Sequence, residues 1–175
     1  ADVDGDGDPD LVVSRSSTGL QLLENDGAAG FTDVTTGRLP PGGSSPTALR
    51  FADVDGDGDQ DLVQANFGSA ARLFLNDGSG SFSEGPATAL RSTGFRRRGL
   101  RVAEVDGEGD VDRVFANDET EAIRIFENDG SGVFVDVTTA AIPATAFGAS
   151  DITVGDVDGD GWPDLIASSF GDSTQ

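Results

Sequence analysis

The chain contains no cysteine, histidine, methionine, tyrosine or lysine among its 175 residues. Without cysteine and histidine there is no thiolate nucleophile, no imidazole base, no disulfide and no zinc site of the nitrogen and sulfur type. Without lysine there is no Schiff base. Carboxylate, carbonyl and hydroxyl oxygens are almost the only metal ligands left, so any bound metal is expected to be a hard cation.

Long hydrophobic runs are missing as well. Hydrophobic residues make up 36% of the chain and occur only in short runs, whereas a membrane span needs roughly 20 consecutive apolar residues. We therefore expect no membrane insertion.

The most regular feature of the sequence is an internal repeat. Nine-residue acidic segments begin at Asp2, Asp53, Glu104 and Asp156, which are 51, 51 and 52 residues apart. A second marker, Asn-Asp-Gly followed by a phenylalanine, keeps the same step and begins at Asn25, Asn76 and Asn128. We interpret the chain as one repeat array with units of about 1–46, 47–98 and 99–149 and a partial unit 150–175.

Each unit consists of short β-branched or apolar runs separated by turns, which is typical of strands. In the second unit the runs predict strands at 47–51, 62–66, 72–75 and 81–84. Asn76-Asp77-Gly78 is expected to form a tight turn, because Asn and Gly tolerate a positive φ. Four antiparallel strands in about 50 residues, repeated, predict an all-β fold built of propeller blades.

The acidic segments follow the pattern Asp-x-Asp-x-Asp-Gly-x-x-Asp, which places carboxylates at alternate positions of a tightly turning loop. Calcium takes six to eight oxygen ligands at about 2.3 to 2.6 Å, so these carboxylates are predicted to converge on one ion. The predicted ligands, with position seven acting through its backbone carbonyl, are Asp2, Asp4, Asp6, Asp8 and Asp10; Asp53, Asp55, Asp57, Asp59 and Asp61; Glu104, Asp106, Glu108, Asp110 and Asp112; Asp156, Asp158, Asp160, Trp162 and Asp164.

One Ca²⁺ is expected per loop, up to four in all, and the loop 104–112 is expected to bind most weakly, because two Glu lengthen the arms of a tight loop. A merely solvated acidic surface would have no reason to repeat this spacing. An EF-hand is excluded because position twelve, where it needs Glu, is Val13, Gln64, Phe115 or Ala167.

The net charge of -21 arises from 32 acidic and 11 basic residues. Nineteen of the acidic residues lie in the four loops, which leaves 13 to face 11 arginines elsewhere. Outside its loops the protein is therefore close to neutral, and nucleic-acid binding is not expected.

The fourth unit, with Phe147-Gly148-Ala149-Ser150 followed by residues 155–166, resembles an FG-GAP repeat, the blade unit of the integrin α-chain propeller. Only the closing Gly-Ala-Pro is replaced, by Ser168-Ser169-Phe170. The other units, with their Asn-Asp-Gly hairpin, are more similar to the bacterial VCBS branch. The resemblance implies a calcium-stabilised β-propeller that is usually extracellular and usually a binding or adhesion module.

About three and a quarter repeats are too few to close a propeller. We therefore expect the chain to be a fragment of a larger extracellular or cell-surface protein. The alternative is a homo-oligomer in which incomplete terminal blades of several copies complete a ring.

The function that follows is recognition of an extracellular protein or a glycan. A lectin domain, a calcium-dependent carbohydrate-active enzyme and a structural spacer without a ligand are the alternatives. We do not expect an enzyme, because a catalytic carboxylate pair should occur once, whereas every carboxylate cluster here recurs in each unit.

Two surface features remain open. Five of the arginines lie within 91–101, around the connector 94–99, and could bind an anion, although pairing with nearby acidic loops or simple solvation is the favoured interpretation. Trp162 could stack on a sugar, but we expect it to pack against the adjacent blade. Phe67 and Phe170 are likewise expected to pack rather than to contact a ligand.

Overall fold

The computed structural model describes residues 1–15, 19–41, 45–86, 97–104, 111–117, 123–142 and 151–168. In this part of the chain the fold is all-β, as predicted, with strands arranged in four antiparallel sheets. The strands are β1 (Leu11–Arg15), β2 (Gly19–Asn25) and β3 (Phe31–Asp33); β4 (Pro46–Ala52), β5 (Asp61–Asn66), β6 (Arg72–Asn76) and β7 (Phe82–Glu84); β8 (Arg97–Ala103), β9 (Asp112–Asn117), β10 (Arg124–Asn128) and β11 (Phe134–Asp136); β12 (Asp151–Gly155) and β13 (Asp164–Ser168).

The second and third sheets confirm the predicted four-stranded blade. Their orders are β4-β5-β6-β7 and β11-β10-β9-β8, so neighbouring strands in the sequence are neighbours in the sheet. The first sheet has the order β1-β2-β3 and the fourth pairs β12 with β13. Two four-residue helices, α1 (Thr35–Arg38) and α2 (Thr138–Ala141), follow β3 and β11.

The Asn-Asp-Gly turn lies where it was predicted, but its backbone differs from the prediction. Asn76 is the last residue of β6 and pairs with Phe82, so the loop spans 77–81. The positive φ values belong to Gly78 (75°) and Gly80 (74°). The Asp77 carboxylate accepts hydrogen bonds from the backbone N–H of Ser79 at 3.0 Å and that of Ser81 at 3.3 Å. Asn is therefore free for another role.

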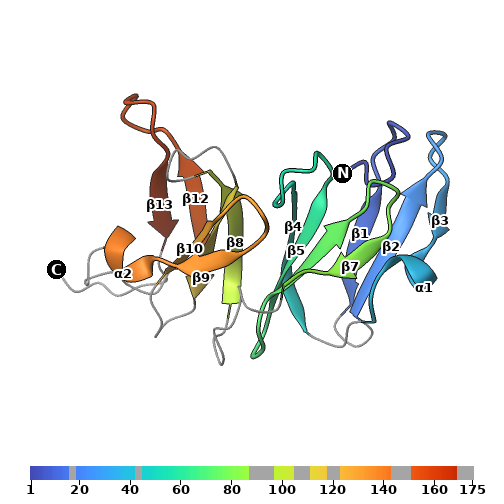
Figure 1. The fold of residues 1–175 in the computed structure, drawn as a ribbon, viewed down its shortest axis with the longest axis horizontal. Helices are drawn as coiled ribbons and strands as arrows, with labels where there is room; N and C mark the ends of the chain where they lie inside the picture. Colours follow the sequence, from blue (N-terminus) through green and yellow to red (C-terminus); the bar gives the residue numbers. More distant parts are fainter. Residues whose placement is uncertain are drawn as a thin grey trace.

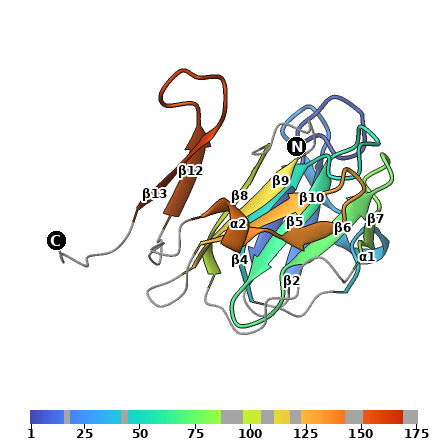
Figure 2. The ribbon, with the colours of Figure 1, turned by 60° about the vertical axis from the view of Figure 1, so that its left-hand side comes forward.

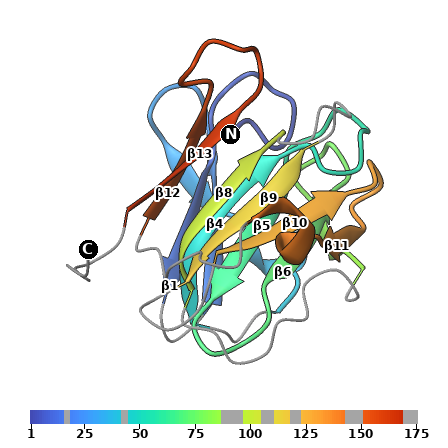
Figure 3. The same cartoon turned by 90° about the vertical axis from the view of Figure 1, so that its left-hand side faces the viewer.

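The sheets follow one another side by side along the chain, with the acidic loops 2–10, 53–61 and 156–164 on a common edge of the array (Figure 1). The first strands of successive units, β4, β8 and β12, lie next to each other (Figure 3). The β12–β13 pair forms one end of the array (Figure 2).

The hydrophobic core lies between the sheets rather than within any one of them. Each junction between successive sheets holds its own cluster of buried side chains. Burying a Leu or Phe side chain contributes roughly 1.5 to 3 kcal/mol, so each sheet depends on its neighbours for stability. The three clusters are Val3, Leu22, Leu39, Leu62, Phe74 and Phe82; Val54, Val63, Ala65, Ala71, Leu73, Leu100, Phe126 and Phe134; Ile123, Ile125 and Ile152.

Of the described segments, none forms a helix with the length and apolar character that a membrane crossing requires.

Candidate metal centres

The first carboxylate of each described acidic loop organises the loop backbone. Asp2 accepts hydrogen bonds from the backbone N–H groups of Gly5 and Gly7, both at 2.9 Å. These glycines have φ values of 77° and 94°, a region that L side chains rarely enter. Asp53 and Asp156 hold the equivalent glycines of their own loops in the same way. The glycines that the pattern requires are thus the ones that let the loop curl.

The next two carboxylates cap the turns that follow them. Asp4 accepts from the N–H of Asp6 at 3.3 Å, and Asp6 accepts from the N–H of Asp8 at 2.8 Å. The loop 53–61 repeats both bonds. Each carboxylate uses one oxygen for the backbone here, so its other oxygen remains available to a cation.

Three of the predicted loops bring carboxylate oxygens together. In each group one oxygen per residue lies within 4.8 Å of the others. Two ligands of a single Ca²⁺ lie at most about 5 Å apart, because each is about 2.3 to 2.6 Å from the ion. The three clusters therefore have the donor type and spacing that calcium needs. They are Asp2, Asp4 and Asp6; Asp53, Asp55 and Asp57; Asp156, Asp158 and Asp164.

The carboxylate at position nine has a structural role of its own. Asp61 is fully buried and accepts hydrogen bonds from the N–H of Val54 at 3.0 Å and from the N–H of Asn76 at 2.8 Å. It therefore ties the acidic loop to the hairpin of the same sheet. Asp10 makes the same two bonds in the first unit, to Val3 and Asn25.

The carboxylates at position seven are not among the clustered ones, and the binding of calcium through the position-seven backbone carbonyl stays a prediction. The Asp59 carboxylate packs against the hairpin of its own sheet, where a Cβ on Gly78 would lie 2.6 Å from Asp59 Oδ2. Asp8 packs against Gly27 in the same manner. In the fourth loop the N–H of Trp162 donates to Asp160 at 2.8 Å, and its side chain is 58% exposed. The expected packing of Trp162 is therefore not found.

The third acidic loop and several of the predicted surface residues lie partly outside the described residues. In the third loop, Glu104 is half-buried and Asp112 is fully buried, with its Oδ1 accepting from the N–H of Asn128 at 2.9 Å. Asp106, Glu108 and Asp110, like Arg91, Arg96 and Phe170, lie outside the described residues. Phe67 is 52% exposed, so its predicted packing is at most partial.

The hairpin asparagine links neighbouring sheets, a role that the sequence interpretation missed. Asn76 Nδ2 donates to the backbone carbonyl of Val3 in the preceding acidic loop at 2.8 Å, and Asn128 Nδ2 donates to that of Val54 at 2.8 Å. Both valines are 1% exposed. The recurrence of Asn in the three hairpins was the available signal, because a turn alone would also accept Asp or Gly. The acidic loops 2–10 and 53–61 are thus each attached to the next sheet.

Burial and crowding of like charges shift the titration of the loop carboxyls. Burial raises the pKa of Asp61 to about 6, against the hydrogen bonds from Val54 and Asn76 that favour the ionised form. Burial also raises the pKa of Asp4 and of Asp55, and the neighbouring carboxylates add to the rise.

These shifts predict how pH affects the calcium-free protein. The folded-state pKa of Asp61, about 6, exceeds its ordinary value of 3.8, so the folded state binds this proton more tightly than the unfolded chain. The stability that this proton adds to the folded state is fully present below pH 3.8 and is lost as the pH rises through about 6. In chelator, urea unfolding is expected to show higher stability at mildly acidic than at neutral pH. Asp61→Asn should flatten this dependence, and an equal slope in both proteins would contradict the prediction.

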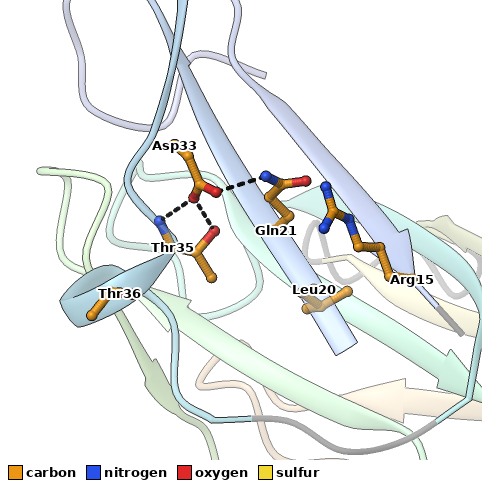
Figure 4. Close-up of a pocket in the computed structure, with 6 residues that line it drawn as sticks. All are labelled: Arg15, Leu20, Gln21, Asp33, Thr35 and Thr36. Atoms are coloured by element: carbon orange, nitrogen blue, oxygen red, sulfur yellow. Dashed lines mark hydrogen bonds between the residues drawn. The ribbon is translucent and has the colours of Figure 1, made fainter. Parts of the chain in front are cut away.

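A polar cavity of about 440 Å³ on the first sheet is a second place to consider (Figure 4). It is lined by Arg15, Leu20, Gln21, Asp33, Thr35 and Thr36. Gln21 Nε2 donates to Asp33 Oδ2 at 2.7 Å. The same cross-strand position in the third sheet holds the ion pair between Arg124 and Asp136 at 2.7 Å. The polar pair therefore belongs to the repeat rather than to a site particular to this cavity.

Antiparallel sheets that stack side by side, with acidic loops before β1, between β4 and β5 and between β12 and β13, define a β-propeller-like repeat array. A family model described as FG-GAP-like repeat matches residues 2–64, 53–115 and 105–167. The chain therefore belongs to the FG-GAP-like repeat family.

Two solved structures extend this comparison. A lectin of Agrocybe aegerita, described as recognising non-reducing terminal N-acetylglucosamine, is 25% identical with a TM-score of 0.52 over 77% of this chain and 35% of the lectin chain. BBS1N, solved in complex with ARL6DN and soaked with lead, is 15% identical with a TM-score of 0.56 over 89% of this chain and 46% of that chain. The chain thus spans less than half of either structure. Comparison with curated proteins gave no match.

Proposed function

We propose that the chain is a calcium-stabilised, non-catalytic binding module of an extracellular protein, and that it recognises a glycan or a protein. One observation carries the calcium part of this proposal. Three loops in different sheets gather carboxylate oxygens within 4.8 Å with similar backbone hydrogen bonds in each. A solvated acidic surface has no reason to gather carboxylates in the same loop of the repeat three times.

Calcium would supply positive charge where carboxylates otherwise repel one another. The residues that would hold it are the clustered carboxylates, joined by the position-nine carboxylates, which use their oxygens for backbone N–H groups but retain further lone pairs. The loop 104–112 is proposed as the fourth and weakest site. We expect affinities on the order of micromolar to millimolar, as in extracellular modules.

The effect of calcium would extend beyond the loops. The Val3 carbonyl of the first loop accepts a hydrogen bond from Asn76 in the next sheet, and the Val54 carbonyl of the second loop accepts one from Asn128. An ion that fixes the loop backbone would therefore also fix the junction between two sheets. This coupling makes the cation a structural element of the array.

Recognition of a glycan is favoured by the similarity to the Agrocybe aegerita lectin. The case for a non-catalytic role rests on recurrence, because the three carboxylate clusters of the described residues are copies of one pattern. A carbohydrate-active enzyme would require a carboxylate pair particular to one place. The exposed Trp162 offers an apolar ring beside one calcium loop.

Calcium titration of the chelator-stripped protein tests the proposal. Isothermal titration should detect three or four ions per chain. Trp162 is the only tryptophan, so its fluorescence should report the loop 156–164 alone and should stop responding in Asp156→Asn. Absence of calcium binding would refute the metal proposal. A glycan array that includes terminal N-acetylglucosamine, probed with and without calcium, tests recognition separately.

A further inference from the structure

The first and last sheets of the described array expose large apolar side chains at positions that the middle sheets bury. On the first sheet, Phe31 is 52% exposed, whereas its repeat equivalents Phe82 and Phe134 are 7% and 5% exposed. Leu11 is 45% exposed, whereas its equivalent Leu62 is 0% exposed. In the middle of the array these positions face the preceding sheet, where Leu62 and Phe82 pack against Val3 and Leu22.

The last sheet shows the complementary pattern. Val157 is 65% exposed, whereas its equivalents Val3 and Val54 are both 1% exposed. Ile166 is 49% exposed, whereas its equivalent Val63 is 0% exposed. Within the described residues, Val3, Val54 and Val63 are buried because the sheet that follows each of them in the array covers them. The two ends of the array therefore display the two halves of one interface.

The polar contact of that interface is also divided between the two ends. At the internal junctions the hairpin asparagine donates to the valine carbonyl of the preceding loop. Asn25 of the first sheet donates within its own sheet, to Pro9 O at 3.1 Å, as Asn128 also does to Val111 O at 3.3 Å, but among the described residues it has no bond to another sheet. Val157 carries the equivalent carbonyl at the other end.

We propose that the first sheet of one copy docks on the last sheet of a second copy and reproduces the junction found inside the array. Phe31 and Leu11 of one copy cover Val157 and Ile166 of the other, and Asn25 donates to the Val157 carbonyl. The occupant is a second copy because one chain displays the equivalents of Leu62 and Phe82 on its first sheet and those of Val3 and Val63 on its last sheet. Such a contact is head-to-tail, so it leads to a closed ring or to a longer array.

The test is the solution mass of the protein over a concentration series in millimolar calcium, measured by sedimentation. The mass of the wild-type chain should rise from the 17.9 kDa of one copy to at least twice that value. Phe31→Asp and Val157→Asp each disable one end and should abolish the rise. Their equimolar mixture keeps one intact interface and should stop at twice the monomer mass.

A matched control is Val135→Asp. Val135 is 59% exposed on β11, and its equivalent in the second sheet, Ser83, is exposed as well, so this position lies outside the junction. The variant should associate like the wild-type chain, and all three variants should melt like the wild-type monomer, because each replaces an exposed side chain.

Several results would overturn the proposal. A wild-type chain that stays monomeric would mean that other sheets or a different partner, and not a second copy, cover the two ends. A monomeric mixture of the two end variants, or equal loss of association in Val135→Asp, would show that association uses another surface. If Phe31→Asp or Val157→Asp melts below the wild-type monomer, Leu11→Asp and Ile166→Asp test the same two ends.

Discussion

Chelation of calcium is expected to lower the melting temperature of the chain by about 5 to 10 °C for each acidic loop that loses its ion. A ligand at 100 times its dissociation constant stabilises the folded state by about 2.7 kcal/mol, and about 1 kcal/mol shifts the melting temperature of a chain of this size by roughly 2 to 4 °C. Loss of the ions should also restore repulsion among the clustered carboxylates. The measurement is a thermal melt in calcium and in chelator.

Two variants of the loop 53–61 test which carboxylates the calcium-dependent stabilisation requires. Asp55→Asn removes a carboxylate from the cluster Asp53, Asp55 and Asp57 and should remove the calcium-dependent increment of that loop. Asp59→Asn changes the carboxylate that packs against Gly78 and should keep the increment. If both variants respond to calcium like the wild-type chain, or both lose the same increment, the assignment of the cluster as the ligand set is wrong.

Replacement of Asp61 by Ala is expected to be the most destabilising single substitution in the acidic loops, even without calcium. The fully buried carboxylate satisfies the N–H groups of Val54 and Asn76. An unsatisfied buried donor costs about 1 to 3 kcal/mol, so the loss of both partners should lower the free energy of unfolding by about 2 to 6 kcal/mol. Urea unfolding in chelator measures this loss without the contribution of calcium.

Asp61→Asn should recover part of that stability, because its carbonyl oxygen accepts a hydrogen bond from one of the two donors. Asp57→Ala is the matched control, since Asp57 is exposed and its carboxylate bonds only within the loop, to the N–H of Asp59. Equal unfolding midpoints for the two alanine variants would mean that the buried bonds contribute no net stability.

The two results separate two roles within one nine-residue pattern. The carboxylates at positions one, three and five are half-buried or exposed and curl the loop toward a shared centre. In the first three units the carboxylate at position nine, that of Asp10, Asp61 or Asp112, is buried and connects the loop to its hairpin. In the fourth loop Asp164 joins Asp156 and Asp158 instead of Asp160, so position nine also reaches the cluster.

Local patterns were enough to predict the four strands of the second unit and the curled acidic loops of the described residues. The alternation of apolar and polar residues and the glycines between the carboxylates act within a few residues, so their consequences can be inferred from the sequence. The strand predicted at 62–66 is β5 (Asp61–Asn66), and the strand predicted at 72–75 is β6 (Arg72–Asn76). The loop glycines take the positive φ that the curl requires. The fixed step of the repeat and its motifs indicated the family, which the match of the family model over residues 2–167 confirms.

Contacts between units could not be inferred in this way. The bond from Asn76 to the Val3 carbonyl joins residues 73 positions apart, and no local pattern specifies which carbonyl a side-chain amide will reach. The exposure of Phe31 and Val157, compared with the burial of their equivalents, likewise depends on which sheet has a neighbour. Sequence alone determined the repeat, the strands and the acidic loops, because these follow from backbone preferences over short distances. Only the tertiary structure decided which carboxylates are buried and which faces are covered, because both depend on the stacking of one sheet on the next.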